Sequence, residues 1–189
     1  MFVDNAWHQM TALGHDAAKV VDFGPYRIVE RFDVALASLA TRHGREKDVA
    51  KAAKTARLPL PAPARADAGM PFGAFWVAPA MWFIEAPFAT HEDIVAHLKP
   101  VFGDAASITE QTDAWVRFDV SGSGLVALFA RLTHLDLETL PDGYASRTVI
   151  DHLGCYLIRR GGGDITVYGP RSSAEGLLHA MEVAATSVI

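Results

Sequence analysis

Hydrophobic and polar positions change their period most clearly within residues 115–137. Residues 115–120 alternate between apolar and polar side chains, which is typical of a strand with one buried face. Residues 125–135 instead place leucines and a phenylalanine at the spacing of one helix face. Between them, the Ser-Gly-Ser-Gly of residues 121–124 supplies backbone freedom and a hydroxyl that can cap the helix. This stretch therefore predicts a strand, a glycine turn and a helix in succession.

A glycine turn before a helix can bind a phosphate or a carboxylate, because free N–H groups point towards the ligand. The spacing at residues 121–124 matches neither a dinucleotide-binding fingerprint, a P-loop nor a nucleophile elbow. We therefore interpret this segment as a structural turn.

The rest of the chain supplies further strands and helices. Two helix starts have the pattern of a capping box: Thr90 with Asp93, and Ser172 with Glu175. Glycines at 161–163 indicate a hairpin between two strands. The expected helices cover residues 45–57, 91–102 and the segment after 172; the expected strands start near 26 and cover 74–77, 81–85, 107–111, 147–153, 155–160 and 165–168.

The order of these elements is β-α-β-β-α-β followed by β-α-β-β-β-α. It predicts an α+β fold of two consecutive split-βαβ (ferredoxin-like) lobes with antiparallel sheets. Residues 1–25 show no stable period and are expected to form an N-terminal arm, followed by a single two-lobed domain at 26–189. Lobe one is expected at about 26–112, with a proline-rich connector at 58–71, and lobe two at about 113–189.

Composition restricts the class of protein. A length of 189 residues suits one compact domain, and a net charge of −5 argues against nucleic-acid or anionic-membrane partners. Apolar runs fall far short of the ~20 residues that span a bilayer, and no secretory signal is visible, so a cytoplasmic location is expected. A single cysteine excludes an internal disulfide. Because half of the residues are hydrophobic, we expect a partner to cover part of the surface.

No catalytic or metal-binding constellation is visible in the sequence. His91 and His97 stand six positions apart, which would place them on different faces of one helix. Cys155 lies in a strand pattern and is expected to be a buried, inert thiol. Three further histidines are distant in sequence: His134, His152 and His179. We therefore predict no catalytic residue and no metal site.

Two arginines are candidates for binding an anion. Arg147 lies at the start of an expected strand and Arg171 at the start of an expected helix. Each could hold a carboxylate through the two-pronged guanidinium, although a surface ion pair is the simpler interpretation of both. Trp76 and Trp82 are interpreted as core or interface anchors.

Taken together, the pattern resembles the gamma subunit of heterotetrameric sarcosine oxidase, within the fold group of the glycine-cleavage aminomethyltransferases. The resemblance covers about residues 28–185. It departs from the family at residues 78–80, where Ala-Pro-Ala replaces Gly-Pro-Asp, and at 122–124, where Gly-Ser-Gly replaces Gly-Pro-Arg. The matching points are Pro79 with Trp82, residues 116–122 before the leucine-rich helix, Asp136-Leu137, Arg147-Thr148, Arg171-Ser172, the Leu-Pro-Leu-Pro connector and residues 35–42.

The resemblance implies a complex of alpha, beta, gamma and delta subunits that oxidises sarcosine to glycine, with tetrahydrofolate as the one-carbon acceptor. It implies FAD, FMN, NAD and tetrahydrofolate in the larger subunits, zinc in the small delta subunit, and no cofactor in this chain. This chain would be a non-catalytic subunit that packs on the larger ones, with Arg147 and Arg171 as its only folate candidates. Two alternatives remain open: a free-standing folate-binding or one-carbon-transfer protein, and a scaffold module without an enzyme.

Overall fold

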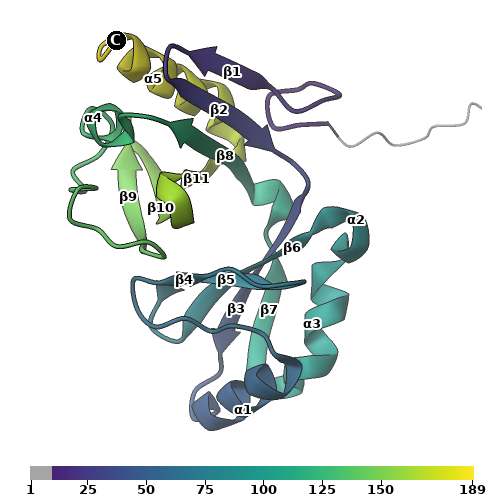
Figure 1. The fold of residues 1–189 in the computed structure, drawn as a ribbon. Helices are drawn as coiled ribbons and strands as arrows, with labels where there is room; N and C mark the ends of the chain where they lie inside the picture. The colour runs from purple at the N-terminus through teal and green to yellow at the C-terminus, as the bar shows by residue number, and fades with distance from the viewer. Residues whose placement is uncertain (1–9) are drawn as a thin grey trace, which may run out of the picture.

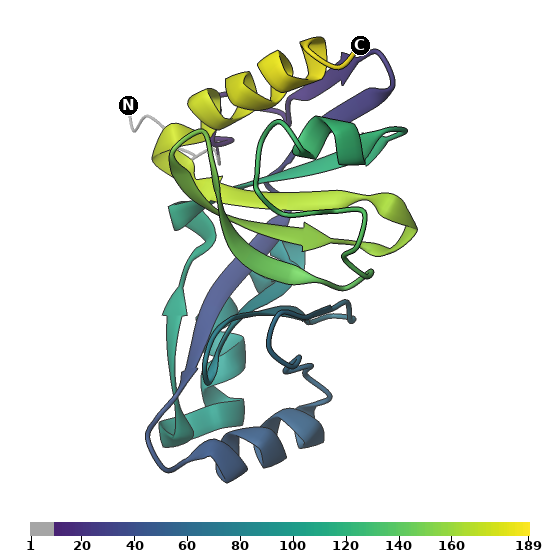
Figure 2. The ribbon, with the colours of Figure 1, turned by 90° about the vertical axis from the view of Figure 1, so that its left-hand side faces the viewer.

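Two antiparallel sheets form the framework of the protein in a computed structural model that describes residues 10–189 (Figure 1). The six-stranded sheet has the order β1-β2-β8-β11-β10-β9 and the five-stranded sheet the order β4-β5-β6-β3-β7. The helices lie on the outer sides, so that the two sheets face one another (Figure 2). The predicted α+β class with two antiparallel sheets is therefore confirmed.

The six-stranded lobe combines segments from both ends of the chain. Its strands are β1 (Val20–Phe23), β2 (Tyr26–Arg31), β8 (Trp115–Gly122), β9 (Ala145–Ile150), β10 (Leu153–Arg159) and β11 (Ile165–Pro170), and its helices are α4 (Leu125–Phe129) and α5 (Ala174–Thr186). Strands β9, β10 and β11 form an antiparallel meander, and β8 pairs with β11 rather than with β9 or β10, so this lobe does not have the expected split-βαβ strand order. Because a hairpin joins β10 to β11 directly, no helix can cross over between them.

The five-stranded lobe has the ferredoxin-like order β7-β3-β6-β5 that the sequence predicts, with β4 added at one edge. Helices α1 and α3 cover its outer face, because each presents buried apolar residues to the sheet. Its strands are β3 (Val34–Thr41), β4 (Ala66–Asp67), β5 (Gly73–Ala78), β6 (Met81–Pro87) and β7 (Ala106–Glu110), and its helices are α1 (Glu46–Ala56), α2 (Phe88–His91) and α3 (Ile94–Phe102). Short 3₁₀ turns occupy Gly103–Ala105, Thr112–Ala114, Gly161–Gly163 and Arg171–Ser173.

The N-terminal region differs from the expected arm. Residues 1–9 lie outside the described part of the chain, but β1 pairs with β2 at the edge of the six-stranded sheet. The buried Glu30 carboxylate accepts hydrogen bonds from the backbone N–H groups of Leu13 and Lys19, which fixes residues 10–19 against the same lobe. β2 therefore belongs with residues 115–170, and the chain enters the five-stranded lobe only at β3, not at residue 26 as expected. Whether residues 26–189 fold as one domain stays a prediction.

The connector at 58–71 belongs to the five-stranded lobe more closely than expected. Leu58 is buried, the Trp82 indole N–H donates to the Pro61 carbonyl oxygen at 2.8 Å, and β4 pairs with β5.

Two helix starts also differ from the sequence interpretation. Asp93, rather than Thr90, caps the helix that starts at Ile94, and α5 starts at Ala174 without a side-chain cap.

The central strand and helix are present, but the helix is short. β8 alternates as predicted, whereas α4 ends at Phe129, and Leu132 and Leu135 pack against the core from the turns that follow. α4 has no side-chain cap, because Gly124 occupies the cap position in the left-handed conformation. Gly122 has a φ of 128° and lies against the Pro25 carbonyl, where a Cβ would come within 2.0 Å of the oxygen.

We expect Gly122→Ala to destabilise the protein by more than about 1 kcal/mol, because the substitution adds both backbone strain and a backbone clash. Gly176→Ala is the matched control, since Gly176 lies in α5 with open space around its Cα. This control should stabilise the protein by about 0.5–1 kcal/mol through helix propensity. Urea unfolding of both variants measures the difference, and equal effects of the two changes would contradict the close approach of β8 to Pro25.

An aromatic cluster joins the two sheets. Phe75 from β5 is fully buried between the lobes and stacks on Tyr168 of β11, with ring centroids 5.4 Å apart and an interplanar angle of 23°. Phe83, Tyr156 and Trp115 continue the cluster through edge-on and tilted contacts. Buried aromatic surface therefore fixes the position of one lobe on the other.

Candidate functional site

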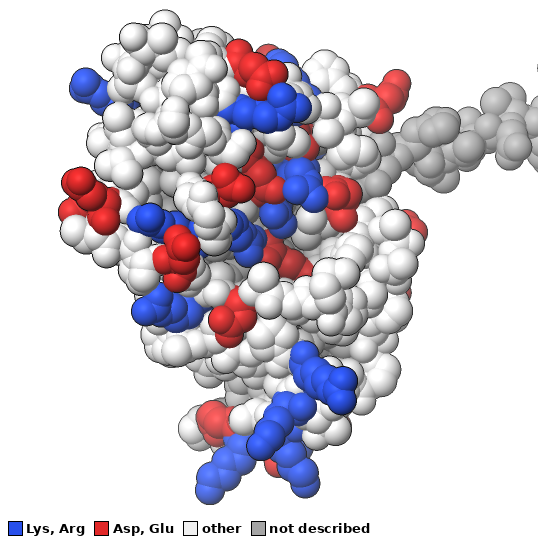
Figure 3. Space-filling model, in the orientation of Figure 1, with Lys and Arg blue, Asp and Glu red and all other residues white. Residues whose placement is uncertain are grey.

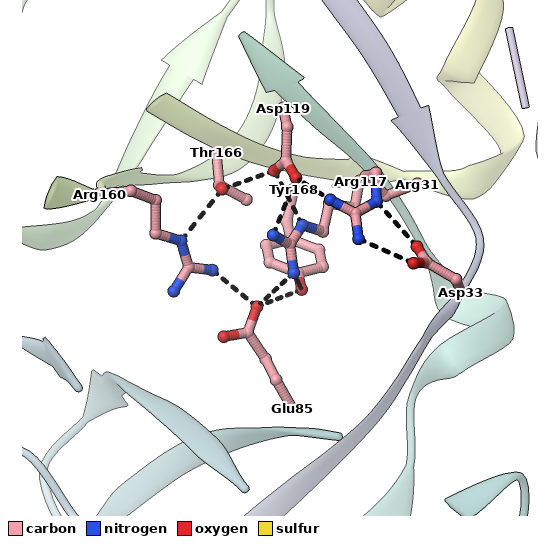
Figure 4. A network of polar contacts seen from close by, with 8 residues as sticks. All are labelled: Arg31, Asp33, Glu85, Arg117, Asp119, Arg160, Thr166 and Tyr168. Atoms are coloured by element: carbon pink, nitrogen blue, oxygen red, sulfur yellow. Dashed lines mark hydrogen bonds and ion pairs between the residues drawn. The ribbon is translucent and has the colours of Figure 1, made fainter. Parts of the chain in front are cut away.

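A network of charged side chains crosses the interface between the lobes beside the aromatic cluster (Figure 4). Glu85 comes from β6 of the five-stranded lobe, and its partners Arg117, Arg160 and Tyr168 come from the six-stranded lobe. The Glu85 Oε1 atom accepts hydrogen bonds from Arg160 Nη2 at 2.7 Å, Arg117 Nη1 at 3.1 Å and the Tyr168 hydroxyl at 2.5 Å. One carboxylate oxygen therefore binds three donors from the opposite lobe.

Asp119 organises the other half of the network. It accepts two hydrogen bonds from Arg117, both of 2.9 Å, one from the Thr166 hydroxyl at 2.7 Å, and one from Arg31 at 2.9 Å. Arg31 in turn binds Asp33 through Nε and Nη2. Three arginines thus balance three carboxylates, and within residues 10–189 every fully buried side-chain nitrogen or oxygen has a hydrogen-bond partner.

The electrostatics of the network keep its acids ionised. Burial alone would raise the pKa of Glu85, but the charges of Arg160 and Arg117 outweigh burial and hold it below its ordinary value. The same competition with Arg117 lowers the pKa of Asp119, whereas burial and the Glu85 charge raise the pKa of Tyr168. A general base at neutral pH needs a pKa near 7. The shifts move the pKa values of Glu85 and Asp119 further below 7 and the pKa of Tyr168 further above it. The network is therefore suited to holding the lobes together.

A cavity of about 340 Å³ opens beside this network. Arg31, Glu85, Arg117 and Arg160 form its charged wall, and residues 68–73 form the facing loop. Side chains of both signs gather around the hollow between the lobes (Figure 3). This cavity is a candidate for ligand contact at the interface, because ion pairs already fix the charged side chains of its wall.

The arginines singled out from the sequence lie outside this network. Arg147 is exposed on the edge strand β9, where its guanidinium lies over Gly154. Arg171 follows β11 and donates to the Met10 carbonyl oxygen at 2.7 Å, and it also lies 3.8 Å from an Asp113 carboxylate oxygen. Arg171 thus helps to hold the N-terminal segment, and a folate or anion role for either arginine stays a prediction.

The structure settles two other sequence interpretations. Cys155 is completely buried, as expected, and burial raises the pKa of its thiol to about 11, which fits an unreactive thiol. The prediction for His91 and His97 is wrong: their ring centroids lie only 4.4 Å apart, because the helix breaks between them. Across residues 10–189 no group of three or more His, Cys, Asp or Glu side chains is placed to hold a metal ion.

We expect the free energy of unfolding to fall as the pH drops below about 5, because Glu85 and Asp119 have lowered pKa values in the folded state. The folded protein then binds fewer protons than the unfolded chain, so this stabilisation is present above the unfolded pKa values and is lost on acidification. Urea unfolding at a series of pH values measures the slope. Glu85→Gln should reduce the slope, and an identical pH dependence in this variant would contradict the assignment.

Comparison with known proteins identifies the fold. No family model and no curated protein matches the sequence. The glycine cleavage system aminomethyltransferase T from Bartonella henselae superposes with a TM-score of 0.59 at 12% identity, over 80% of this chain and 44% of that one. The two-lobed architecture is therefore an aminomethyltransferase-like fold. A heterotetrameric sarcosine oxidase chain from Corynebacterium sp. U-96, in a complex with pyrrole 2-carboxylate, superposes with a TM-score of 0.76 at 16% identity, over 89% of this chain and 88% of that one.

These likenesses confirm the suspected resemblance at the level of the fold. The sarcosine oxidase chain has nearly the same extent as this one, whereas the aminomethyltransferase is more than twice as long as the part that matches.

No helix within residues 10–189 has the length and apolar character needed to cross a membrane.

Proposed function

We propose that this chain is a non-catalytic, gamma-type subunit of a heterotetrameric sarcosine oxidase, a complex that oxidatively demethylates sarcosine to glycine with tetrahydrofolate as the one-carbon acceptor. The near end-to-end match of its fold with a chain of such an enzyme carries the proposal. Larger alpha and beta subunits and a small zinc-binding delta subunit would be its partners. FAD, FMN, NAD and tetrahydrofolate would then bind in the larger subunits, and the complex would be cytoplasmic.

The internal chemistry of the chain fits a structural subunit. Its buried charges pair with one another across the lobe interface, and their pKa shifts take them away from acid–base catalysis near neutral pH. Exposed apolar side chains remain on the six-stranded lobe, among them Val126, Val149 and Val183. Such side chains suit a surface that packs against a permanent partner.

Co-expression tests the proposal directly. The chain should co-purify with alpha, beta and delta subunits from the same genome as one complex of fixed stoichiometry, and omission of this chain should reduce assembly and sarcosine-dependent peroxide formation. Assembly of a fully active oxidase without it, or failure of the chain to join the complex, would contradict the proposal. Val183→Glu tests the apolar surface of α5 and should weaken assembly of the complex. Glu175→Gln, also on the exposed side of α5, is the control and should leave assembly unchanged.

A free-standing folate-binding protein is the alternative that the aminomethyltransferase-like fold supports. In that case the isolated chain should bind tetrahydrofolate in a calorimetric titration, and Arg147→Ala or Arg171→Ala should weaken the binding. Because Arg171 also holds residue 10, its variant needs a parallel unfolding measurement. The absence of binding to a folded chain would leave the subunit role or a scaffold module without an enzyme, and the co-expression experiment distinguishes these.

A further inference from the structure

A break between two helices brings a pair of histidines together on the five-stranded lobe. α2 ends at His91, Asp93 caps the next helix by accepting a hydrogen bond from the Ala96 N–H at 2.9 Å, and α3 starts at Ile94. The chain changes direction at this point, so His97 on the first turn of α3 meets His91. The two imidazole rings lie with centroids 4.4 Å apart and an interplanar angle of 43°.

His91 is held in position by contacts on two sides. Its Nδ1 atom lies 2.8 Å from the Thr90 hydroxyl oxygen, and that hydroxyl donates to the Pro87 carbonyl oxygen at 3.4 Å. The Thr90 hydroxyl oxygen can accept from Nδ1–H while it donates to this carbonyl, and in that tautomer the lone pair is on Nε2. Phe72 packs edge-on against the same ring, with centroids 5.0 Å apart.

We propose that His91 and His97 form a two-imidazole binding site for a borderline divalent cation such as Zn²⁺, Ni²⁺ or Cu²⁺. Metal-bound histidines commonly donate the second ring N–H to a fixed acceptor, and the Thr90 hydroxyl oxygen lies where it can accept such a bond from His91 Nδ1. Imidazoles that share one ion, with metal–nitrogen distances of about 2.1 Å, have ring centroids about 5 Å apart. The observed separation is within a small side-chain rotation of that distance.

The surroundings favour metal binding over a packed histidine pair. His97 is exposed and His91 is partly exposed, so an ion can reach the pair from solvent. Water would complete the coordination. Imidazole ligands bind Zn²⁺, Ni²⁺ and Cu²⁺ well and Mg²⁺ and Ca²⁺ poorly, so the site should discriminate between these two groups of ions.

Titration of the untagged full-length chain with NiCl₂ or ZnCl₂ in a calorimeter tests the site. We expect one site on the wild-type chain, a loss of affinity of more than about tenfold in His91→Gln and in His97→Gln, and no binding of MgCl₂. His43→Gln is the matched control, because His43 is another exposed histidine of the same lobe. Equal affinity in the wild type and in both site variants would overturn the proposal.

Two further measurements keep the test independent of folding defects. Thr90→Val should weaken nickel binding by about tenfold by releasing the His91 ring, while both imidazoles remain. The electron paramagnetic resonance spectrum of bound Cu²⁺ should show two imidazole nitrogens in the wild type and one in each His→Gln variant, with unchanged circular dichroism. A spectrum without imidazole nitrogens in a folded wild-type chain would contradict the site.

Discussion

Replacing Glu85 by Gln should lower the free energy of unfolding by about 3–5 kcal/mol, because it removes the carboxylate that pairs with Arg160 and one of the two that pair with the buried Arg117. Glu85 has only 9% of its side chain exposed, and Arg117 has 15%. A neutral amide cannot offset the desolvation of Arg117 and Arg160, which both donate to the same Glu85 oxygen. Urea unfolding followed by circular dichroism measures the loss.

Asp142→Asn is the control for this prediction. Asp142 also pairs with an arginine, Arg159 at 3.2 Å, but more than half of its side chain is exposed. Exposed pairs contribute about 0–1 kcal/mol, so the two variants should differ clearly. If Glu85→Gln were as stable as Asp142→Asn, the network across the interface would not hold the lobes together.

Phe75→Ala should destabilise the protein by about 3–5 kcal/mol, since it leaves a cavity at the centre of the lobe interface. Phe75 is fully buried and contacts Phe83, Tyr156 and Tyr168. Two contributions to the free energy of unfolding are lost. One is the burial of the aromatic ring away from water, and the other is its packing against rings that cannot move to fill the cavity. Thermal or urea unfolding gives the magnitude.

Met70→Ala serves as the comparison for Phe75→Ala. Met70 is 87% exposed, and a surface truncation should change stability by no more than about 0.5 kcal/mol. A small effect of Phe75→Ala would show that the lobes do not depend on the aromatic cluster. A second unfolding transition in this variant would instead show that the cluster couples the two lobes.

The sequence predicts the positions of the strands and helices better than it predicts which strands pair with one another. Periodicity along residues 115–122 and the glycines at 161–163 identify strands and a hairpin, because these patterns are local. β2 was assigned to the wrong lobe, since its partner in the sheet, β8, lies far along the chain: Arg31 bonds to Asp119 across 88 positions. The same non-locality hides the pairing of β8 with β11 in the six-stranded sheet.

The charged network was missed for a related reason. Arg117 and Asp119 occupy the polar positions of an alternating strand, which ordinarily face solvent. The only sequence signal was Glu85, a single carboxylate within the apolar strand β6, where a buried charge requires a partner. The histidine pair was missed because helical spacing applies only to a continuous helix, and Asp93 begins a new one.

The discontinuity of the six-stranded lobe has a consequence for synthesis on the ribosome. β1 and β2 emerge first, but β2 pairs with β8, and the remaining strands of that sheet come later still. The five-stranded lobe occupies a continuous segment from β3 to β7, all of which emerges before β8 does. Pairings between distant segments form slowly. The N-terminal hairpin therefore waits with an unpaired edge while the lobe encoded after it folds, and during that interval it depends on protection from aggregation.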